Sequence, residues 1–318
     1  MPRLPLIVVA LCAALPVVAV AETAVILNSG DESVSLIDTL TYREIKRFPI
    51  GKEPHHLLAT PDDKELIVAN AASNNLVFLD PLSGEILRRL PQISDPYQIG
   101  YSPDKKWFVS ASNRLDRVDV YHAADFKLAK RLEAPKTPSH IAFNQDSSLA
   151  FITLQESHEV MAIDLKTLST AWKHGVGHQP AGIWMTPDNK HLLVAITGED
   201  YVEIIDWRNR KTLQKLKTGK GAHNFLAMGD SRHLLLSNRM ENTVSILDMQ
   251  TLTVKETFRV PGGPDDMELT RDGKELWVTS RWIKKVQVVD MTTKKIKHSI
   301  PVGYSPHGIY FHTHAPRQ

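Results

Sequence analysis

The sequence predicts an all-β fold, a seven-bladed β-propeller, because three landmarks recur at one interval of 42 residues. The first is a proline, replaced once by alanine, that opens each repeat and is called the anchor residue here. The second ends an alternating apolar run, and the third is an aspartate in a turn. The anchor residues are Pro54, Pro96, Pro138, Pro180, Ala222, Pro264 and Pro306. The run ends are Asp38, Asp80, His122, Asp164, Asp206, Asp248 and Asp290, and the turn aspartates are Asp62, Asp104, Asp146, Asp188, Asp230 and Asp272.

Each repeat contains the signals of four short strands. In the repeat that begins at Pro54, the β-prone runs are HLLAT, ELIVAN, NLVFLD and EILRRL. The segments PDDK, AASN and PLSG between them have turn compositions. Four strands in 42 residues is the size of one propeller blade, and no long helical period competes with this interpretation.

The two ends of the chain are predicted to build one blade together. Residues 24–49 supply only the last three strands of a repeat, and residues 306–312 supply only the first. We therefore expect the C-terminal strand to join the N-terminal blade, which closes the ring and removes two exposed sheet edges. The predicted organisation is a signal peptide at residues 1–21 followed by one propeller at residues 22–318.

The first residues are typical of a secretory signal. Arg3 precedes an apolar stretch, and the small residues Ala19 and Ala21 predict cleavage after Ala21 and a periplasmic protein without a membrane span. The single cysteine, Cys12, lies inside this segment, so the processed chain would carry no thiol. Disulfides, thiolate metal sites, cysteine nucleophiles and covalently attached c-type haem are thereby excluded.

Charge and motifs exclude further classes of function. Removing the signal takes away one of the 38 basic residues and leaves 37 against 36 acidic ones, so nucleic-acid binding is not expected. The sequence also lacks a G-x-S-x-G elbow, a P-loop, an H-E-x-x-H motif and a dinucleotide fingerprint. The expected partner is a small molecule or another periplasmic protein, and the expected state is a monomer.

The repeats resemble the YVTN-type β-propeller family of exported bacterial proteins along essentially the whole processed chain. The resemblance rests on the patterns P-x-G-I…P-D-x-K-x-L and N-T-V-S-I-L-D, as in PAGIWMTPDNKHLLV (180–194), NTVSILD (242–248) and SPHGIY (305–310). The tetrapeptide that names the family is degraded, for example to Ile67-Val68-Ala69-Asn70. The resemblance implies a scaffold and an exported location but no particular reaction.

One face of the propeller is predicted to carry the function. The turns before the first strand and between the second and third strands share this face, called the anchor face here. Five of the fourteen positions that directly follow the anchor residues are histidine, and aspartate also occurs there. Neutral imidazoles with a carboxylate would suit copper or zinc. The candidate metal ligands are His55, His56, His140, His223, Asp265 and His307.

Arg239, Arg281 and Trp282 follow the second strands of two adjacent blades and are predicted to contact an anion or a partner. The leading hypothesis is a binding or accessory protein that uses this channel mouth. The alternative is a metal- or haem-assisted enzyme in the same place, either a lactonase-like hydrolase or an oxidoreductase accessory. The histidines could equally be ordinary residues at a wet channel mouth.

The third residue after each anchor residue is apolar in every blade, which predicts a packed core between blades rather than a cofactor site. These residues are Leu57, Ile99, Ile141, Ile183, Phe225, Met267 and Ile309.

Overall fold

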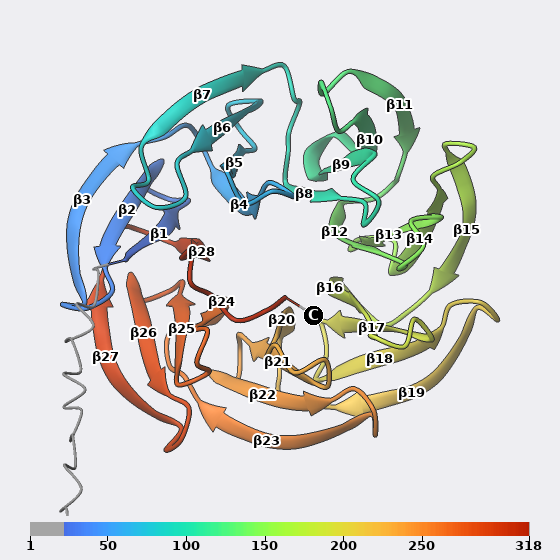
Figure 1. Ribbon diagram of the computed structural model, residues 1–318. Coiled ribbons are helices and arrows are strands. Elements are labelled where there is room, and N and C mark those ends of the chain that lie inside the picture. The colour runs from blue at the N-terminus through green and yellow to red at the C-terminus, as the bar shows by residue number, and fades with distance from the viewer. Residues whose placement is uncertain (1–21, 318) are drawn as a thin grey trace, which may run out of the picture.

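The computed structural model describes residues 22–317, so the predicted signal peptide lies outside the described residues. Seven four-stranded antiparallel sheets surround one axis, which confirms the predicted propeller (Figure 1). Residues 22–317 contain no α-helix, only the short 3₁₀ turn η1 (Asn113–Leu115), and thus no helix long and apolar enough to cross a membrane.

The strands follow one another blade by blade. Blade 1 contains β28 (Pro306–Tyr310), β1 (Thr23–Asn28), β2 (Ser33–Asp38) and β3 (Arg43–Pro49), and blade 2 contains β4 (Pro54–Ala59), β5 (Leu66–Asn70), β6 (Asn75–Leu79) and β7 (Ile86–Pro91). Blade 3 contains β8 (Gln98–Tyr101), β9 (Trp107–Ser112), β10 (Arg117–His122) and β11 (Leu128–Glu133), and blade 4 contains β12 (Pro138–Phe143), β13 (Leu149–Leu154), β14 (Glu159–Asp164) and β15 (Ser169–Gly175). Blade 5 contains β16 (Pro180–Met185), β17 (His191–Ile196), β18 (Tyr201–Asp206) and β19 (Lys211–Lys217), and blade 6 contains β20 (Ala222–Ala227), β21 (His233–Asn238), β22 (Thr243–Asp248) and β23 (Thr253–Arg259). Blade 7 contains β24 (Pro264–Leu269), β25 (Glu275–Ser280), β26 (Lys285–Asp290) and β27 (Lys295–Pro301).

Burial follows the position of each strand in its blade. The second strands are the most buried, and in β5 every residue of LIVAN is buried. The outermost strands lie at the perimeter, and β7 is exposed along most of its length. A strand covered on both faces by neighbouring blades can be apolar throughout, whereas a perimeter strand must face water.

Ring closure occurs where the sequence predicts it. β28 pairs antiparallel with β1, with Ile309 opposite Ile26 and Tyr310 opposite Val25. The pairing completes a sheet in the order β28-β1-β2-β3 and covers the inner edge of β1.

The repeated aspartates stabilise turns, as predicted. Asp62 accepts hydrogen bonds from the Thr60 hydroxyl (2.8 Å) and the Lys64 amide (3.4 Å). Asp38 accepts bonds from the amides of Leu40 and Thr41 at 2.9 and 2.8 Å. A short side chain that binds backbone amides a few residues ahead is the usual device for such turns.

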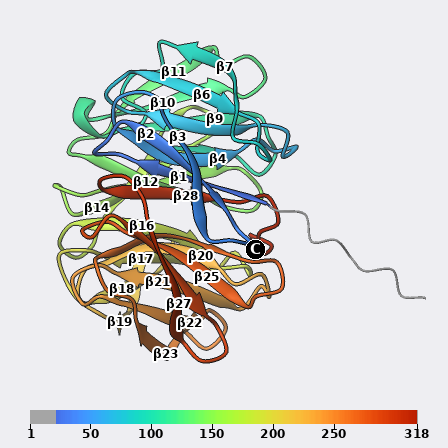
Figure 2. The same cartoon turned by 90° about the vertical axis from the view of Figure 1, so that its left-hand side faces the viewer.

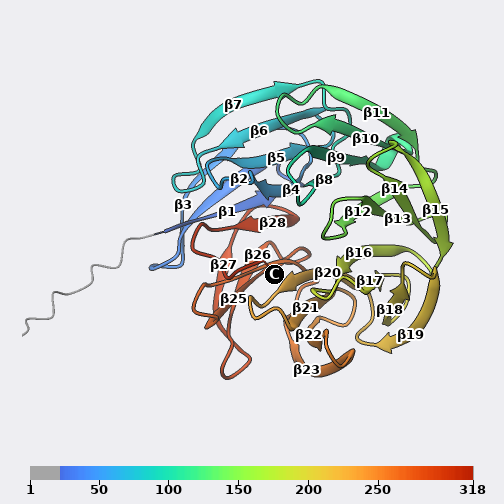
Figure 3. The same cartoon turned by 45° about the vertical axis from the view of Figure 1, so that its right-hand side comes forward.

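The C-terminal tail runs toward the axis on the face opposite the anchor face. The Ala315 amide donates to the Leu269 carbonyl at 2.7 Å, and His314 forms a bridge with Thr270. Figures 1 and 3 both place the end of the chain near the centre of the ring. Figure 2, which views the ring from its edge, shows that end at one side of the disc. The tail therefore partly covers one end of the channel.

Candidate binding site

A backbone irregularity at the start of the first strand, present in every blade except blade 3, directs two residues into the channel. In β12 the regular pairing breaks between Pro138 and Ile141, and the side-chain hydroxyl of Thr153 accepts the His140 amide at 2.9 Å. The same arrangement recurs where Thr279 accepts the Asp266 amide at 3.0 Å. Because a bulge releases residues from the ladder and re-aims their side chains, the two residues after each anchor residue become channel-lining positions.

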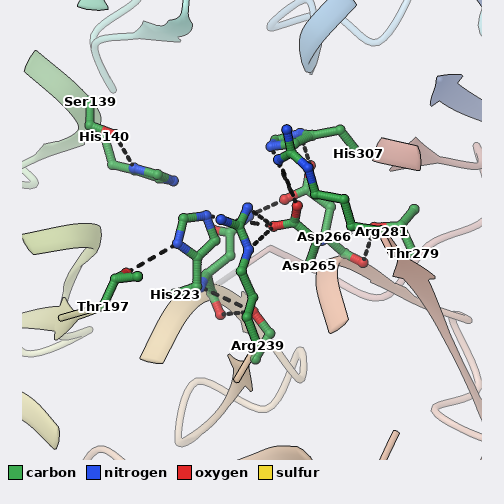
Figure 4. Close-up of polar contacts among 12 residues, drawn as sticks. Ser139, His140, Thr197, His223, Arg239, Asp265, Asp266, Thr279, Arg281 and His307 are labelled. Atoms are coloured by element: carbon green, nitrogen blue, oxygen red, sulfur yellow. Dashed lines mark hydrogen bonds and ion pairs between the residues drawn. The ribbon is translucent and has the colours of Figure 1, made fainter. Parts of the chain in front are cut away.

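Asp265 lies at the centre of the first of these two layers. Its carboxylate is completely buried and accepts bonds from two arginines: Arg239 through Nε (3.0 Å) and Nη2, and Arg281 through Nη1 (3.2 Å) (Figure 4). Arg239 comes from blade 6 and reaches across the blade boundary. Burial alone would raise the pKa of Asp265, but Arg239 and the other neighbouring cationic groups hold it well below its usual value.

Three rings pack in a row on one side of this carboxylate. The His307 and His55 rings lie 4.0 Å apart, and the His55 ring stacks on Tyr97 at 3.7 Å, each distance between ring centroids. His55 Nδ1 lies 2.8 Å from the Tyr97 carbonyl oxygen, which can only accept, so Nδ1 carries the proton. A neutral His55 therefore keeps a lone pair on Nε2.

His223 and His140 occupy the other side. Their rings meet edge to face at 5.3 Å across blade 5, where the corresponding positions are the small residues Ala181 and Gly182. A Cβ on Gly182 would lie 2.2 Å from the His223 carbonyl oxygen, so only glycine permits this approach. The Thr197 hydroxyl donates to the Ala222 carbonyl at 2.7 Å and thus accepts from His223 Nδ1 at 3.2 Å, which leaves the lone pair on Nε2.

Burial keeps most of these imidazoles neutral. It lowers the pKa of His55 and His223 well below the usual value, with further lowering from His307 on the first and from Arg239 on the second. The pKa of His56 falls to about 4 and that of His140 to about 3, again mainly through burial. Near pH 7 these four rings therefore add hydrogen-bonding groups but no charge to the channel.

His307 separates two carboxylates. Its Nε2 lies 3.7 Å from Asp265 Oδ2, and its Nδ1 lies 3.3 Å from Asp266 Oδ2. These are ion-pair distances, but neither ring nitrogen forms a hydrogen bond with any group of residues 22–317. Asp266 instead accepts a short bond from the Asn224 amide group.

The second layer faces the other end of the channel. Its polar residues line a cavity of about 180 Å³ together with apolar residues one position further along each strand. The structure thus divides the predicted metal ligands between two layers: His55, His223, Asp265 and His307 in the first, and His56 and His140 in the second. Within residues 22–317 no group of three or more His, Cys, Asp or Glu side chains is placed to hold a metal ion, and the metal hypothesis stays a prediction.

The residues predicted to contact an anion or a partner lie in two different places. Arg239 and Arg281 both reach Asp265, with 18% and 28% of their side chains exposed. Trp282 is half exposed and lies over Gly263, where a Cβ would be 2.5 Å from the indole ring. It therefore forms part of the outer rim.

Sequence reasoning missed several residues of the channel. Tyr97, Gln98 and Asn224 follow anchor residues and could have been found from their register, although their chemistry is not distinctive. Glu268 gave a clearer signal, because it places a carboxylate where the other blades have apolar or small residues. It is buried and pairs with Arg317 of the C-terminal tail.

Comparison with known proteins identifies the scaffold. The model of the YNCE-like beta-propeller family matches residues 2–317. The chain belongs to the YNCE-like β-propeller family. Among curated proteins, this YNCE-like propeller matches none.

Solved structures share the fold of this YNCE-like propeller at low sequence identity. A functionally unknown protein from Desulfotomaculum acetoxidans is 15% identical, with a TM-score of 0.76, and the match covers 92% of this chain and 99% of that one. The dihydro-heme d1 dehydrogenase NirN, solved in complex with DHE, is 16% identical with a TM-score of 0.68 and coverages of 91% and 75%. Kuenenia stuttgartiensis hydrazine synthase is 17% identical with a TM-score of 0.67 and coverages of 79% and 87%. These similarities describe the fold, which supports many functions.

Proposed function

We propose that this propeller is a binding protein that holds a small anionic molecule at the anchor-face mouth of its channel. The observation that carries the proposal is that Arg239 and Arg281 share one buried carboxylate, Asp265. Two cations against one anion leave a local charge of +1, because the pKa values of His55 and His223 keep both rings neutral near pH 7. A fixed positive charge at a channel mouth with limited access to water attracts anions.

The hydrogen-bonding groups at the mouth fit such a ligand. Within residues 22–317, neither Nη1 of Arg239 nor Nη2 of Arg281 is used in a hydrogen bond, and both side chains are partly exposed. Guanidinium groups bind carboxylate and phosphate oxygens in pairs of hydrogen bonds. The Nε2 lone pairs of His55 and His223 would accept bonds from a hydroxyl or amine of the same molecule.

The mouth is organised before a ligand arrives. Asp265 fixes both guanidinium groups, Ser305 accepts a bond from Arg281 Nε at 2.9 Å, and Tyr97 stacks on His55. Side chains that are already ordered lose little conformational entropy on binding, so the binding free energy is reduced little by ordering them.

Replacing one guanidinium should weaken anion binding. We expect Arg281→Gln to lower the affinity for citrate or inorganic phosphate at least tenfold, because the local charge falls to zero and a pair of donors is lost. Isothermal titration calorimetry at low salt measures this effect. Arg114→Gln is the matched control: Arg114 lies on the same face but pairs with both Glu53 and Asp95, so its surroundings are not positive. Equal losses in both variants, or no binding by the wild type, would contradict the proposal.

Copper or zinc is the second candidate ligand, favoured by the unprotonated Nε2 atoms of His55 and His223. On this alternative, untagged protein purified from a periplasm contains stoichiometric metal, and the His55→Ala/His307→Ala double variant does not. Elemental analysis of the wild type and the double variant tests this alternative. If neither protein contains metal, copper or zinc is not the ligand. Asp265 has little capacity left as a ligand, because Oδ1 already accepts two hydrogen bonds and Oδ2 accepts one.

We also propose that the protein is periplasmic and monomeric after cleavage behind Ala21. The supporting observation is the apolar segment after Arg3. The intact mass of the exported protein tests this cleavage site directly.

A further inference from the structure

The face opposite the anchor face contains two adjoining hollows. The outer hollow has a volume of about 710 Å³ and the inner one about 180 Å³. They share Ile141, Ile183, Trp184 and Arg317, so these residues mark the passage from one to the other. The outer hollow is mainly apolar, with Phe143, Met185 and Pro187 in its wall. The inner one ends at the second layer of channel residues.

The inner hollow contains polar groups that the protein leaves unpaired. His140 is 95% buried and pairs with Ser139 through Nδ1 (2.8 Å), while its Nε2 makes no hydrogen bond within residues 22–317 (Figure 4). Nε2 accepts in the tautomer whose Nδ1 donates to Ser139, and donates in the other tautomer. Asp266 accepts from Asn224 through one oxygen only. Buried polar groups are normally paired, so open ones in a cavity indicate a polar ligand, and the carboxylate of Asp266, which can only accept, favours one that brings donors.

The charge of the inner hollow is negative. Among residues 22–317, Asp266 is the only carboxylate in its lining, and the pKa values of His56 and His140 keep both rings neutral. Arg317 lies at the passage, but it forms an ion pair with Glu268, so these two charges offset each other above the pKa of Glu268. Burial raises that pKa to about 7, against the opposing effect of Arg317.

We propose that these two hollows form a second binding site, which takes an amine with an apolar tail. The ammonium group would supply up to three donors and one positive charge to Asp266 in the inner hollow, and would favour the His140 tautomer whose Nε2 accepts one of these donors. The tail would lie against Trp184 and Phe143 in the outer one, where apolar contact and aromatic faces favour it. Within the inner hollow, Ile183 and the other apolar residues one position beyond the second layer line the wall as well as packing between blades.

The second site is distinct from the anion site. His307 stands between Asp265, which the two arginines engage, and Asp266, which faces the inner hollow. The two layers occupy adjacent positions of the same strands, and only the second lines the inner hollow. A variant that removes one site therefore leaves the other testable.

Calorimetry with hexylammonium at about pH 8, where Glu268 is ionised, tests the second site. We expect hexylammonium to bind at least tenfold more tightly than hexanol, and Asp266→Asn to lower the hexylammonium affinity at least tenfold. Arg281→Gln should leave it unchanged, whatever happens to anion binding. Equal binding of hexanol, stronger binding of hexanoate, or full affinity in Asp266→Asn would overturn the proposal.

A second variant guards against misfolding of Asp266→Asn. Trp184 is only partly buried, so Trp184→Leu should retain the fold. It should weaken hexylammonium binding several-fold and leave ethylammonium binding unchanged, because only the longer tail reaches the outer hollow. Equal effects on both amines would place the ligand elsewhere and refute the two-hollow site.

Discussion

Acidification from pH 7.5 to 5.5 should lower the free energy of unfolding by several kcal/mol. His55, His56, His140 and His223 are kept neutral by burial in the folded protein, so each has a depressed pKa. In the unfolded chain their pKa returns to about 6.5. Below that pH the unfolded state binds more protons than the folded state, and stability falls as pH falls.

The size of this effect follows from proton counting. Each such histidine contributes about 1.4 kcal/mol per pH unit below roughly pH 6.5, until its folded pKa is reached. The folded-state pKa is about 4 for His56 and about 3 for His140. Glu268 acts in the opposite direction, because its raised pKa of about 7 lets the folded state take up one proton first. The four histidines and the one glutamate together make the free energy of unfolding change by up to about 4 kcal/mol per pH unit.

Urea unfolding followed by tryptophan fluorescence at pH 7.5, 6.5 and 5.5 measures this slope. The His56→Gln/His140→Gln variant should show a distinctly smaller pH dependence. His122→Gln serves as the control, because His122 is exposed at the end of β10 and should leave the slope unchanged. A wild-type stability that stays constant between pH 7.5 and 5.5 would show that burial does not lower the pKa of the channel histidines in the folded protein.

Replacing Asp265 by asparagine should destabilise the fold by about 3–5 kcal/mol. Asparagine keeps the shape of the side chain but leaves Arg239 and Arg281 facing each other without the anion that both engage. Breaking a buried ion pair by removing one partner leaves an uncompensated charge in a poorly solvated place, and this cost is typically of that size.

Denaturant unfolding near pH 7 tests this prediction, and adding Arg281→Gln to the variant should restore part of the loss because one unpaired charge is removed. Asp38→Asn is the matched control. Asp38 is a partly exposed turn residue that binds two backbone amides, and asparagine can accept the same bonds, so the substitution should cost much less. If the two substitutions cost the same, Asp265 does not organise the mouth.

The blades could be predicted from the sequence because their determinants are local and repeated. The Asp62 carboxylate accepts bonds from the Lys64 amide and the Thr60 hydroxyl, each two residues away, and the anchor Pro54 begins a strand in its own blade. Such signals recur at every repeat and need no knowledge of distant contacts. Ring closure followed from counting strands at the two ends.

The site could be predicted only in part, because spacing determines which blade and which end a residue occupies but not the direction of its side chain. Register placed His223, Asp265 and His307 on adjacent blades, yet the bond from Arg239 across a blade boundary to Asp265 depends on side-chain conformation. His55 and His56 belong to different layers because β4 contains a bulge, and the amino-acid composition does not reveal a bulge. The path of Arg317 to Glu268 is set by tertiary contacts of the tail.

The pairing of β28 with β1 also has a consequence for the order of folding. β28 is synthesised after every other strand, so blade 1 has only three strands, with one edge of β1 unsatisfied, until the last residues become available. A contact between the two ends of the chain carries a large loop-closure entropy and forms late. Completion of the ring should therefore be the slow step of folding, and the chain should be most prone to aggregate before that step.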